Sequence, residues 1–322
     1  MSKPIVYIRC EQAEPYLDRI ASLSKEVIVE PWVAGQAMPP MDVDLSEIDV
    51  VLTRGLIDNM SWLQEAKSLK WVHSLTVGVE KLPLPALAKR NIVVTNVKGI
   101  NAIPISEYVL AGILTYAKGY FEFWSQQRQR IWQTREVKEI SGSTIAILGF
   151  GHIGRAIAER AKALGMIVKA MGRSQHDSSY TSLVDAYFVN EQYSEVVADA
   201  DYVVNCLPES QETFCYMNEY RFSLLKKGAL FINVGRGSTV DEHALLLAAK
   251  EHLGGAILDV FQQEPLPEKH FFWNNPRIFV TPHNAFASPK HWSRVFEQFL
   301  QNLVRYQQGM SLENTVDPAK GY

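Results

Sequence analysis

The sequence predicts an α/β protein built from two doubly wound parallel-sheet domains. Two observations support this fold class. Short apolar runs alternate with helical patterns over most of the 322 residues, and a second series of the same kind begins at Thr144, after a long helical stretch. Such alternation is typical of parallel sheets that are covered by helices on both faces, and the length suits two domains.

The predicted strands are four to seven residues long and rich in β-branched or aromatic residues, with helical segments between them. They are Ile5–Ile8, Val50–Thr53, Trp71–Leu75, Ile92–Thr95, Thr144–Leu148, Ile167–Met171, Tyr202–Cys206, Ala229–Val234, Ala256–Val260 and Ile278–Pro282.

Two long helical stretches divide the chain. The stretch 101–133 reads as the first helix of the second domain plus an extension, in which Phe121–Trp124 is rich in aromatic residues. This extension indicates either a subunit contact or packing on the chain's own loops. The stretch 290–308 is expected to return to the first domain. We therefore predict a discontinuous domain of residues 1–98 and 285–322, and a second domain of residues 99–284.

Composition excludes several classes of function. The chain has 47% hydrophobic and 21% charged residues and a net charge of -3, without a basic run, which argues against nucleic acid or an anionic membrane as a partner. There is no apolar signal segment. The three cysteines, Cys10, Cys206 and Cys215, lack metal-type spacing, so we expect no metal site, free thiols and a cytoplasmic location.

A glycine-rich turn follows the predicted strand Thr144–Leu148 at once, as Gly149-Phe150-Gly151-His152-Ile153-Gly154. An amphipathic helix and another strand come next, and in this context the spacing is typical of a dinucleotide-binding site. Gly149 permits the tight turn, Gly151 lets the backbone approach the pyrophosphate, and Gly154 lets the helix pack on the sheet. Free N–H groups and the helix dipole favour the phosphates. A glycine-rich turn without a ligand is the alternative interpretation.

The end of the next strand indicates which dinucleotide is used. NAD enzymes usually carry an acid there, about 20 residues after the motif, which accepts from the ribose 2′-hydroxyl. This sequence has Gly172, Arg173 and Ser174, and no acid before Asp177. The missing acid removes repulsion against a 2′-phosphate, with which Arg173 can pair and to which Ser174 can donate. We therefore expect NADP as the cofactor, with NAD as a possibility. In the alternative interpretation, Arg173 is a solvated surface arginine that does not contact the cofactor.

Three polar residues each follow a predicted strand: Arg236, Glu264 and His283. Together they fit the reduction of a 2-keto acid. Histidine can deliver the proton because its unperturbed pKa lies near working pH, a carboxylate beside it favours the imidazolium and orients the ring, and arginine can hold the substrate carboxylate and polarise the carbonyl. Taken singly, each has a structural explanation as a loop, turn or helix-end residue.

Five stretches are characteristic in combination. They are Gly149–Gly154, Asn205–Pro208, Ile232–Gly237, Leu258–Phe261 with Glu264–Pro267, and Thr281–Ala285. With them the chain resembles the D-isomer-specific 2-hydroxyacid dehydrogenases over essentially its full length. Asn284 departs from the pattern, since an apolar residue is common after the histidine of this family.

The resemblance implies roles for particular residues. Arg236, Glu264 and His283 would be catalytic, and the substrate would bind to Arg236, to His283 and to the backbone amides of Val77 and Gly78 in the loop Ser74–Val79. The cofactor-binding residues would be Gly149, Phe150, Gly151, His152, Ile153, Gly154, Arg173, Ser174, Cys206, Leu207, Pro208, Val234, Gly235, Arg236, Asp259 and His283. The resemblance also implies a Rossmann-like cofactor domain, a flavodoxin-like substrate domain, a cleft between them, and a homodimer formed through the cofactor domain.

The pair Gly172–Arg173 is similar to the NADPH-preferring glyoxylate/hydroxypyruvate reductases of this family. We therefore expect an NADPH-preferring reductase of small 2-keto acids to D-2-hydroxy acids, with His283 as proton donor and acceptor. Formate dehydrogenases share the fold but pair their histidine with glutamine, so Glu264 disfavours that activity. An NAD-linked dehydrogenase for a bulkier D-2-hydroxy acid and a non-catalytic protein that senses the cofactor are the alternatives.

Overall fold

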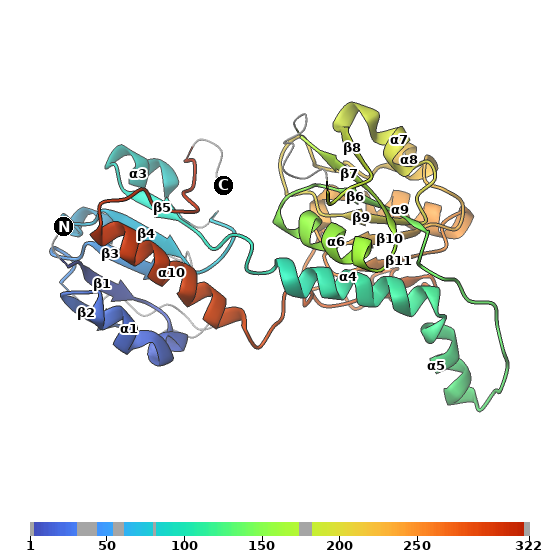
Figure 1. Ribbon diagram of the computed structural model, residues 1–322, viewed down its shortest axis with the longest axis horizontal. Coiled ribbons are helices and arrows are strands. Elements are labelled where there is room, and N and C mark those ends of the chain that lie inside the picture. Colours follow the sequence, from blue (N-terminus) through green and yellow to red (C-terminus); the bar gives the residue numbers. More distant parts are fainter. Residues whose placement is uncertain (1–2, 31–43, 54–60, 80–81, 174–181, 319–322) are drawn as a thin grey trace. The chain divides into compact units, whose positions relative to one another are not determined.

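The computed structural model describes residues 3–30, 44–53, 61–79, 82–173 and 182–318. The chain divides into two compact units, the first formed by Met1–Ile100 with Pro289–Tyr322 and the second by Asn101–Ser288 (Figure 1). The sequence-based boundaries, after residues 98 and 284, fall close to these divisions.

Unit 1 contains a five-stranded parallel sheet in the order β2-β1-β3-β4-β5, which is the flavodoxin-like order. The strands are β1 (Ile5–Ile8), β2 (Glu26–Val29), β3 (Val50–Thr53), β4 (Trp71–Ser74) and β5 (Val93–Thr95). The helices are η1 (Glu11–Tyr16), α1 (Leu17–Ser22), α2 (Ser61–Glu65), α3 (Leu84–Lys89) and α10 (His291–Gln307). Side chains of α10 share one apolar core with β1, β3 and β4, so the C-terminal helix packs on the N-terminal sheet.

Unit 2 contains a seven-stranded parallel sheet in the order β12-β11-β10-β9-β6-β7-β8. The strands are β6 (Thr144–Leu148), β7 (Ile167–Gly172), β8 (Ala186–Val189), β9 (Tyr202–Asn205), β10 (Leu230–Asn233), β11 (Gly255–Leu258) and β12 (Ile278–Val280). The helices are α4 (Ala102–Ala117), α5 (Tyr120–Gln129), α6 (His152–Ala163), η3 (Asn190–Gln192), α7 (Tyr193–Val197), α8 (Glu219–Ser223), η4 (Gly237–Thr239) and α9 (Glu242–Glu251). The order reverses between β6 and β9, and this is the point at which doubly wound sheets bind ligands.

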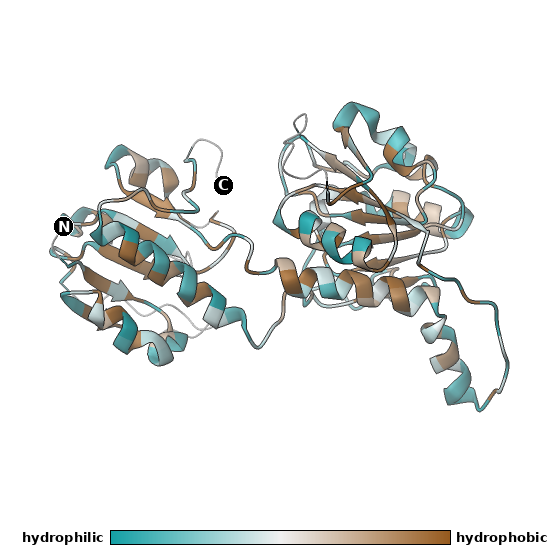
Figure 2. Ribbon diagram, viewed as in Figure 1, coloured by the Kyte–Doolittle hydropathy of each residue, from teal (hydrophilic) through white to brown (hydrophobic). Residues whose placement is uncertain are grey.

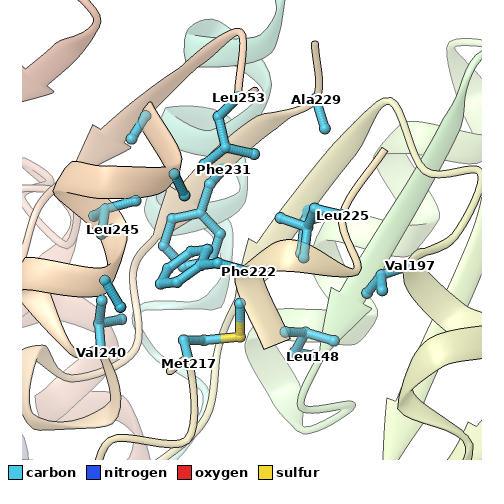
Figure 3. Close-up of a cluster of buried hydrophobic side chains, with 14 of the residues drawn as sticks. Leu148, Val197, Met217, Phe222, Leu225, Ala229, Phe231, Val240, Leu245 and Leu253 are labelled. Atoms are coloured by element: carbon cyan, nitrogen blue, oxygen red, sulfur yellow. The ribbon is translucent and has the colours of Figure 1, made fainter. Parts of the chain in front are cut away.

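Alternate residues of each strand in unit 2 enter two separate cores. Leu148, Val203 and Phe231 pack with α7, α8 and α9 on one face (Figure 3). Ile147, Val204 and Ile232 pack with α4 and α6 on the other face. Figure 2 shows that the apolar colour predominates in the sheet of unit 2, as expected for central strands that are buried on both faces.

The two strands that the sequence pattern did not reveal, β2 and β8, lie at sheet edges. Their side chains are exposed or half-buried. Glu26 interrupts the apolar pattern at the start of β2, whereas β8 is a short apolar run that the sequence-based prediction did not include. The helical stretch expected over 101–133 is also shorter than predicted. Gly119, at φ +68°, separates α4 from α5, and Arg130, at φ +57°, ends α5.

The longest helices, α4 and α10, have 16 and 17 residues. Within the described ranges, no helix combines the length and the apolar character needed to cross a membrane.

Candidate active site

The carboxyl ends of five neighbouring strands of unit 2 carry the predicted site residues. In the sheet order β12-β11-β10-β9-β6, the residues that follow these ends include His283, Glu264, Arg236, Cys206 and Gly149. Because all these strands are parallel, their carboxyl ends meet at one edge of the sheet, and the residues listed above lie at that edge.

The glycine-rich turn has the conformation that a dinucleotide site requires. Gly149 has φ +98°, and a β-carbon on it would lie 3.0 Å from the backbone of Cys206 at the end of β9. A β-carbon on Gly154 would overlap the carbonyl oxygen of Gly149, whereas one on Gly151 would have no neighbour within 4 Å. The helix α6 therefore packs closely on the turn and begins beside open space, which fits a pyrophosphate at its N-terminus.

Two buried asparagines fix the loops that follow β9 and β10. Asn205 Nδ2 donates to Asn233 Oδ1 at 3.1 Å and to Thr239 Oγ1 at 2.7 Å. Asn205 Oδ1 accepts from Leu207 N at 3.2 Å, and Asn233 Oδ1 accepts from Gly235 N at 3.1 Å. These bonds hold the predicted cofactor-binding residues Cys206–Pro208 and Val234–Gly235. Asn205 and Asn233 are not among the predicted site residues, although each is a polar residue at the end of an otherwise apolar strand, and this is the signal that marks them.

The half-buried Cys206 lies beside this turn, and desolvation of its thiol raises the pKa of Cys206 to about 12. It therefore remains a neutral thiol at working pH, since the thiolate forms only near the pKa.

His283 and Glu264 form a hydrogen-bonded pair. His283 Nδ1 lies 2.7 Å from Glu264 Oε2, and the two side chains are 42% and 35% exposed. The second carboxylate oxygen, Glu264 Oε1, accepts from the backbone N–H of Phe261 at 2.9 Å. The carboxylate is thus held from one side by its own loop and directed at the imidazole from the other.

The turn that carries His283 is anchored by Asp259. His283 has φ +50°, a left-handed conformation that is uncommon for a residue other than glycine. The buried Asp259 accepts from Asn284 N at 2.8 Å and Ala285 N at 2.9 Å. It also accepts from the hydroxyl of Thr281 at 2.6 Å. The carboxylate therefore bonds to residues on both sides of His283, which holds the strained turn in place.

Tyr108 on α4 extends this network. Its hydroxyl lies 2.7 Å from Thr281 Oγ1, and burial raises the pKa of Tyr108 to about 12, so the phenol stays protonated. Because Thr281 donates to Asp259, Tyr108 is the group that donates to Thr281. The sequence pattern placed Tyr108 on the helix but gave no sign of this contact, since 173 residues separate the two partners.

Arg236 follows β10 and has an exposed side chain, with Nη1 donating to the carbonyl of Gly235 at 2.9 Å. Its neighbour Gly237 packs directly on the Glu264 loop, because a β-carbon on Gly237 would overlap the backbone of Phe261. This close approach brings the loop of Arg236 next to the loop of Glu264.

The predicted cofactor-selecting residues follow β7. Gly172 ends the strand and Arg173 is exposed beyond it. Ser174 and Asp177 lie outside the described residues.

The predicted carboxylate-binding loop belongs to unit 1 and follows β4. The Asn96 side chain donates to the carbonyl of Val77 at 2.6 Å, and the Thr76 hydroxyl donates to the carbonyl of Gly78 at 2.7 Å. The carbonyl groups of Val77 and Gly78 thus each accept a hydrogen bond from a side chain. Asn96 is a buried positioning residue that the sequence analysis did not identify.

Comparison with known proteins places this site in a family. A family model described as the NAD binding domain of D-isomer specific 2-hydroxyacid dehydrogenases matches residues 110–285. A glyoxylate reductase from Pyrococcus horikoshii is 30% identical over 321 residues, which cover 95% of this chain and 94% of that protein.

Solved structures agree over both units. A D-isomer specific 2-hydroxyacid dehydrogenase family protein from Aeromonas salmonicida has a TM-score of 0.82 and 30% identity, covering 98% of this chain and all 100% of that one. An NADPH-dependent glyoxylate/hydroxypyruvate reductase from Sinorhizobium meliloti, in complex with NADP and sulfate, has a TM-score of 0.79 and 27% identity, with coverage of 99% and 100%.

The fold and these matches define an NAD(P)-dependent oxidoreductase. The chain belongs to the D-isomer specific 2-hydroxyacid dehydrogenase family.

Proposed function

We propose that this protein is an NADPH-preferring reductase that converts small 2-keto acids of the glyoxylate and hydroxypyruvate type to D-2-hydroxy acids. The observation that carries the proposal is the hydrogen-bonded pair of His283 and Glu264. This pair lies at the same edge of the sheet as the glycine-rich turn. The similar Sinorhizobium meliloti protein is named for this activity with NADPH, and the similar Pyrococcus horikoshii protein is named a glyoxylate reductase.

The turn Gly149–Gly154 would hold the pyrophosphate, and Arg173 with Ser174 would meet the 2′-phosphate. The groups proposed to border the rest of the dinucleotide come from neighbouring strand ends, namely Cys206, Leu207, Pro208, Val234, Gly235 and Asp259. When bound, the cofactor supplies the hydride.

His283 is the proposed proton donor in reduction. Its Nδ1 is engaged by the Glu264 carboxylate, so Nε2 is the ring atom that can give a proton to the carbonyl oxygen of the keto acid. The carboxylate fixes the ring and stabilises the imidazolium before the proton leaves.

Arg236 and the backbone amides of Val77 and Gly78 are the proposed carboxylate-binding groups. An arginine can pair with a carboxylate through two N–H groups, and it can also polarise the keto oxygen. The hydrogen bonds from Asn96 and Thr76 to the loop carbonyls support this role, because they constrain the backbone that would present the amides.

The test is a panel of 2-keto acids, with glyoxylate, hydroxypyruvate, pyruvate and larger side chains, each assayed with NADPH and with NADH. We expect the highest kcat/KM for glyoxylate or hydroxypyruvate with NADPH. A preference for NADH and bulkier substrates would contradict the proposal and favour the NAD-linked alternative. Binding of NADPH without turnover of any 2-keto acid would favour the non-catalytic, cofactor-sensing alternative.

We also propose that the protein forms a homodimer through unit 2. In Figure 1, α5 and the returning chain extend away from the sheet. Phe121 packs on the chain itself, stacking on Phe279 with ring centroids 3.4 Å apart. Tyr120 and Trp124 are 64% exposed and Trp132 is 99% exposed. Exposed aromatic residues gathered on one segment are typical of an interaction surface.

The oligomeric state can be measured by sedimentation. We expect a dimer for the native chain and a monomer for Trp124→Glu, with Trp273→Glu as the control because Trp273 is a half-exposed tryptophan outside the α5 segment. A monomeric native chain, or a dimer that survives Trp124→Glu and Trp132→Glu together, would contradict the proposed surface.

We propose a cytoplasmic location. The cysteines Cys10, Cys206 and Cys215 form no disulfide among the described residues, which is consistent with a reducing compartment. Fractionation of the native host, with recovery of keto-acid reductase activity in the cytoplasmic fraction, tests this location.

A further inference from the structure

The end of β7 has a neighbour that the cofactor motif does not include. Strands β7 and β8 are parallel, and Ala170 is opposite Tyr187 in their register. Tyr187 packs against the core on the α6 face of the sheet, the face on which the glycine-rich turn leads into its helix. Its ring meets the ring of Phe150 edge-on, with centroids 5.8 Å apart and an interplanar angle of 69°.

The Tyr187 side chain occupies the space directly beside Gly172. A β-carbon on Gly172 would overlap the Tyr187 hydroxyl and would lie 2.9 Å from ring carbon Cζ. Gly172 is not among the glycines with positive φ, so its backbone conformation would suit any L-residue. A side chain at position 172 could therefore be accommodated only if Tyr187 moved.

The surroundings of Tyr187 favour a neutral phenol. Burial raises the pKa of Tyr187, and the positive charge of Arg155 only partly opposes this effect. Arg155 is held at the turn, since its Nε donates to the carbonyl of Phe150 at 3.3 Å. A neutral phenol does not repel an anionic ligand such as the 2′-phosphate, whereas a carboxylate in the same place would repel it.

We propose that Tyr187 is a specificity-determining residue for the cofactor: it fills the place in which an NAD-selecting carboxylate at position 172 would lie. In enzymes that select NAD, that carboxylate accepts from the ribose 2′-hydroxyl. The inference rests on the proposed use of NADPH and adds a second residue, on a different strand, to the selection. It implies that residues 172 and 187 are coupled, so that an acid at 172 recruits NAD only after Tyr187 is made small.

The experiment is a double-mutant cycle on cofactor binding. Dissociation constants for NADP⁺ and NAD⁺ are measured by calorimetry for the native chain, Gly172→Asp, Tyr187→Ala and the double variant. In the double variant we expect NAD⁺ to bind at least roughly tenfold more tightly than the two single effects predict, because a carboxylate hydrogen bond to the ribose becomes possible. Gly172→Asp alone should weaken NADP⁺ binding without this gain.

Phe188→Ala is the matched control. Phe188 is the next residue on β8 and packs against the core on the opposite face of the sheet, so combining Phe188→Ala with Gly172→Asp should give no coupling. Gly172→Ala provides a measurement without ligand. It adds only the β-carbon, and it should lower Tm in the native chain but not in the Tyr187→Ala background.

Additive effects of Gly172→Asp and Tyr187→Ala on NAD⁺ binding, or an equal fall of Tm for Gly172→Ala in both backgrounds, would overturn the inference. These results differ from a failure of the proposed function, in which the native chain itself would bind NAD⁺ better than NADP⁺ or would not reduce 2-keto acids.

Discussion

His283 lies in a turn and not in a helix or strand, and the Asp259 carboxylate holds this turn in place. The residue has a left-handed conformation, and Asp259 accepts hydrogen bonds from the three residues Thr281, Asn284 and Ala285 around it. Asn284 donates to Asp259 through its backbone N–H. The asparagine side chain, which replaces the apolar residue common in the family, therefore leaves this hydrogen bond intact.

Replacement of His283 tests the proton donor. We expect His283→Ala to lower kcat by about 10²- to 10⁴-fold, the range for loss of a general acid, while NADP⁺ affinity stays within a few-fold of native. His243→Ala, which changes an exposed histidine of α9, is the control. Near-native turnover by His283→Ala would remove the histidine from the proposed chemistry.

Glu264→Gln tests the role of the carboxylate. The amide is nearly the same size but carries no charge, so it stabilises the imidazolium of His283 less. We expect the pH profile of kcat/KM for reduction to move toward acid, with Glu268→Gln as the exposed control in the same loop. If the profile keeps its native shape and position, Glu264 has no tuning role.

Among the elements, α4 is linked to the catalytic turn through side chains. Tyr108 donates to Thr281, which donates to Asp259, and Asp259 holds the backbone beside His283. The helix and the turn both pack on the sheet, but only this chain of hydrogen bonds joins α4 to the histidine turn within the described contacts.

Removal of the Tyr108 hydroxyl should therefore affect catalysis more than binding. We expect Tyr108→Phe to lower kcat roughly tenfold, as for loss of one buried hydrogen bond, with little change in the dissociation constant of NADP⁺. Thr281→Val should act similarly, and the double variant should be no worse than either single one. Tyr116→Phe is the control on the same helix, because its hydroxyl lies against Gly254 at the other end of β11. Additive losses would show that Tyr108 does not act through Thr281.

The stability of the whole molecule in acid depends on a histidine in unit 1, which lowers the free energy of unfolding as the pH falls. His73 on β4 is fully buried beside Trp71 and Phe299. Its Nδ1 lies 2.7 Å from Thr95 Oγ1, and its Nε2 has no hydrogen-bond partner among the residues that the structure describes. Burial lowers the pKa of His73 from 6.5 to about 3.

Between these two pKa values the unfolded chain binds a proton that the folded chain does not, so stability rises with pH across this window and is lost as pH falls. We expect this residue to remove about 1.4 kcal/mol of unfolding free energy for each pH unit below the unfolded value. Urea unfolding at several pH values measures the slope. His73→Phe should flatten it and the exposed His243→Gln should not. An unchanged slope in His73→Phe would assign the acid sensitivity elsewhere.

Much of the fold could be predicted because its signals are local. Central strands such as β6 and β10 are continuous apolar runs, since burial on both faces demands it. The edge strand β2 escaped prediction because it begins with Glu26 and offers only three apolar residues in a row. The edge strand β8 is apolar throughout, from Ala186 to Val189, and was missed although its pattern is that of a strand. Gly119 ends α4 through its left-handed backbone, and a helical pattern by itself does not show which glycine will do so.

The sequence by itself determined the α/β class, the glycine-rich turn and the polar residues that follow strands, because each depends on a few consecutive residues. Only the tertiary structure decided which strand ends are neighbours, how Asp259 and Tyr108 hold the turn of His283, and why residue 172 is glycine. These depend on contacts between side chains far apart in the sequence, as between Tyr108 and Thr281 or Gly172 and Tyr187. Their free energies belong to pairs of residues, so no local pattern records them.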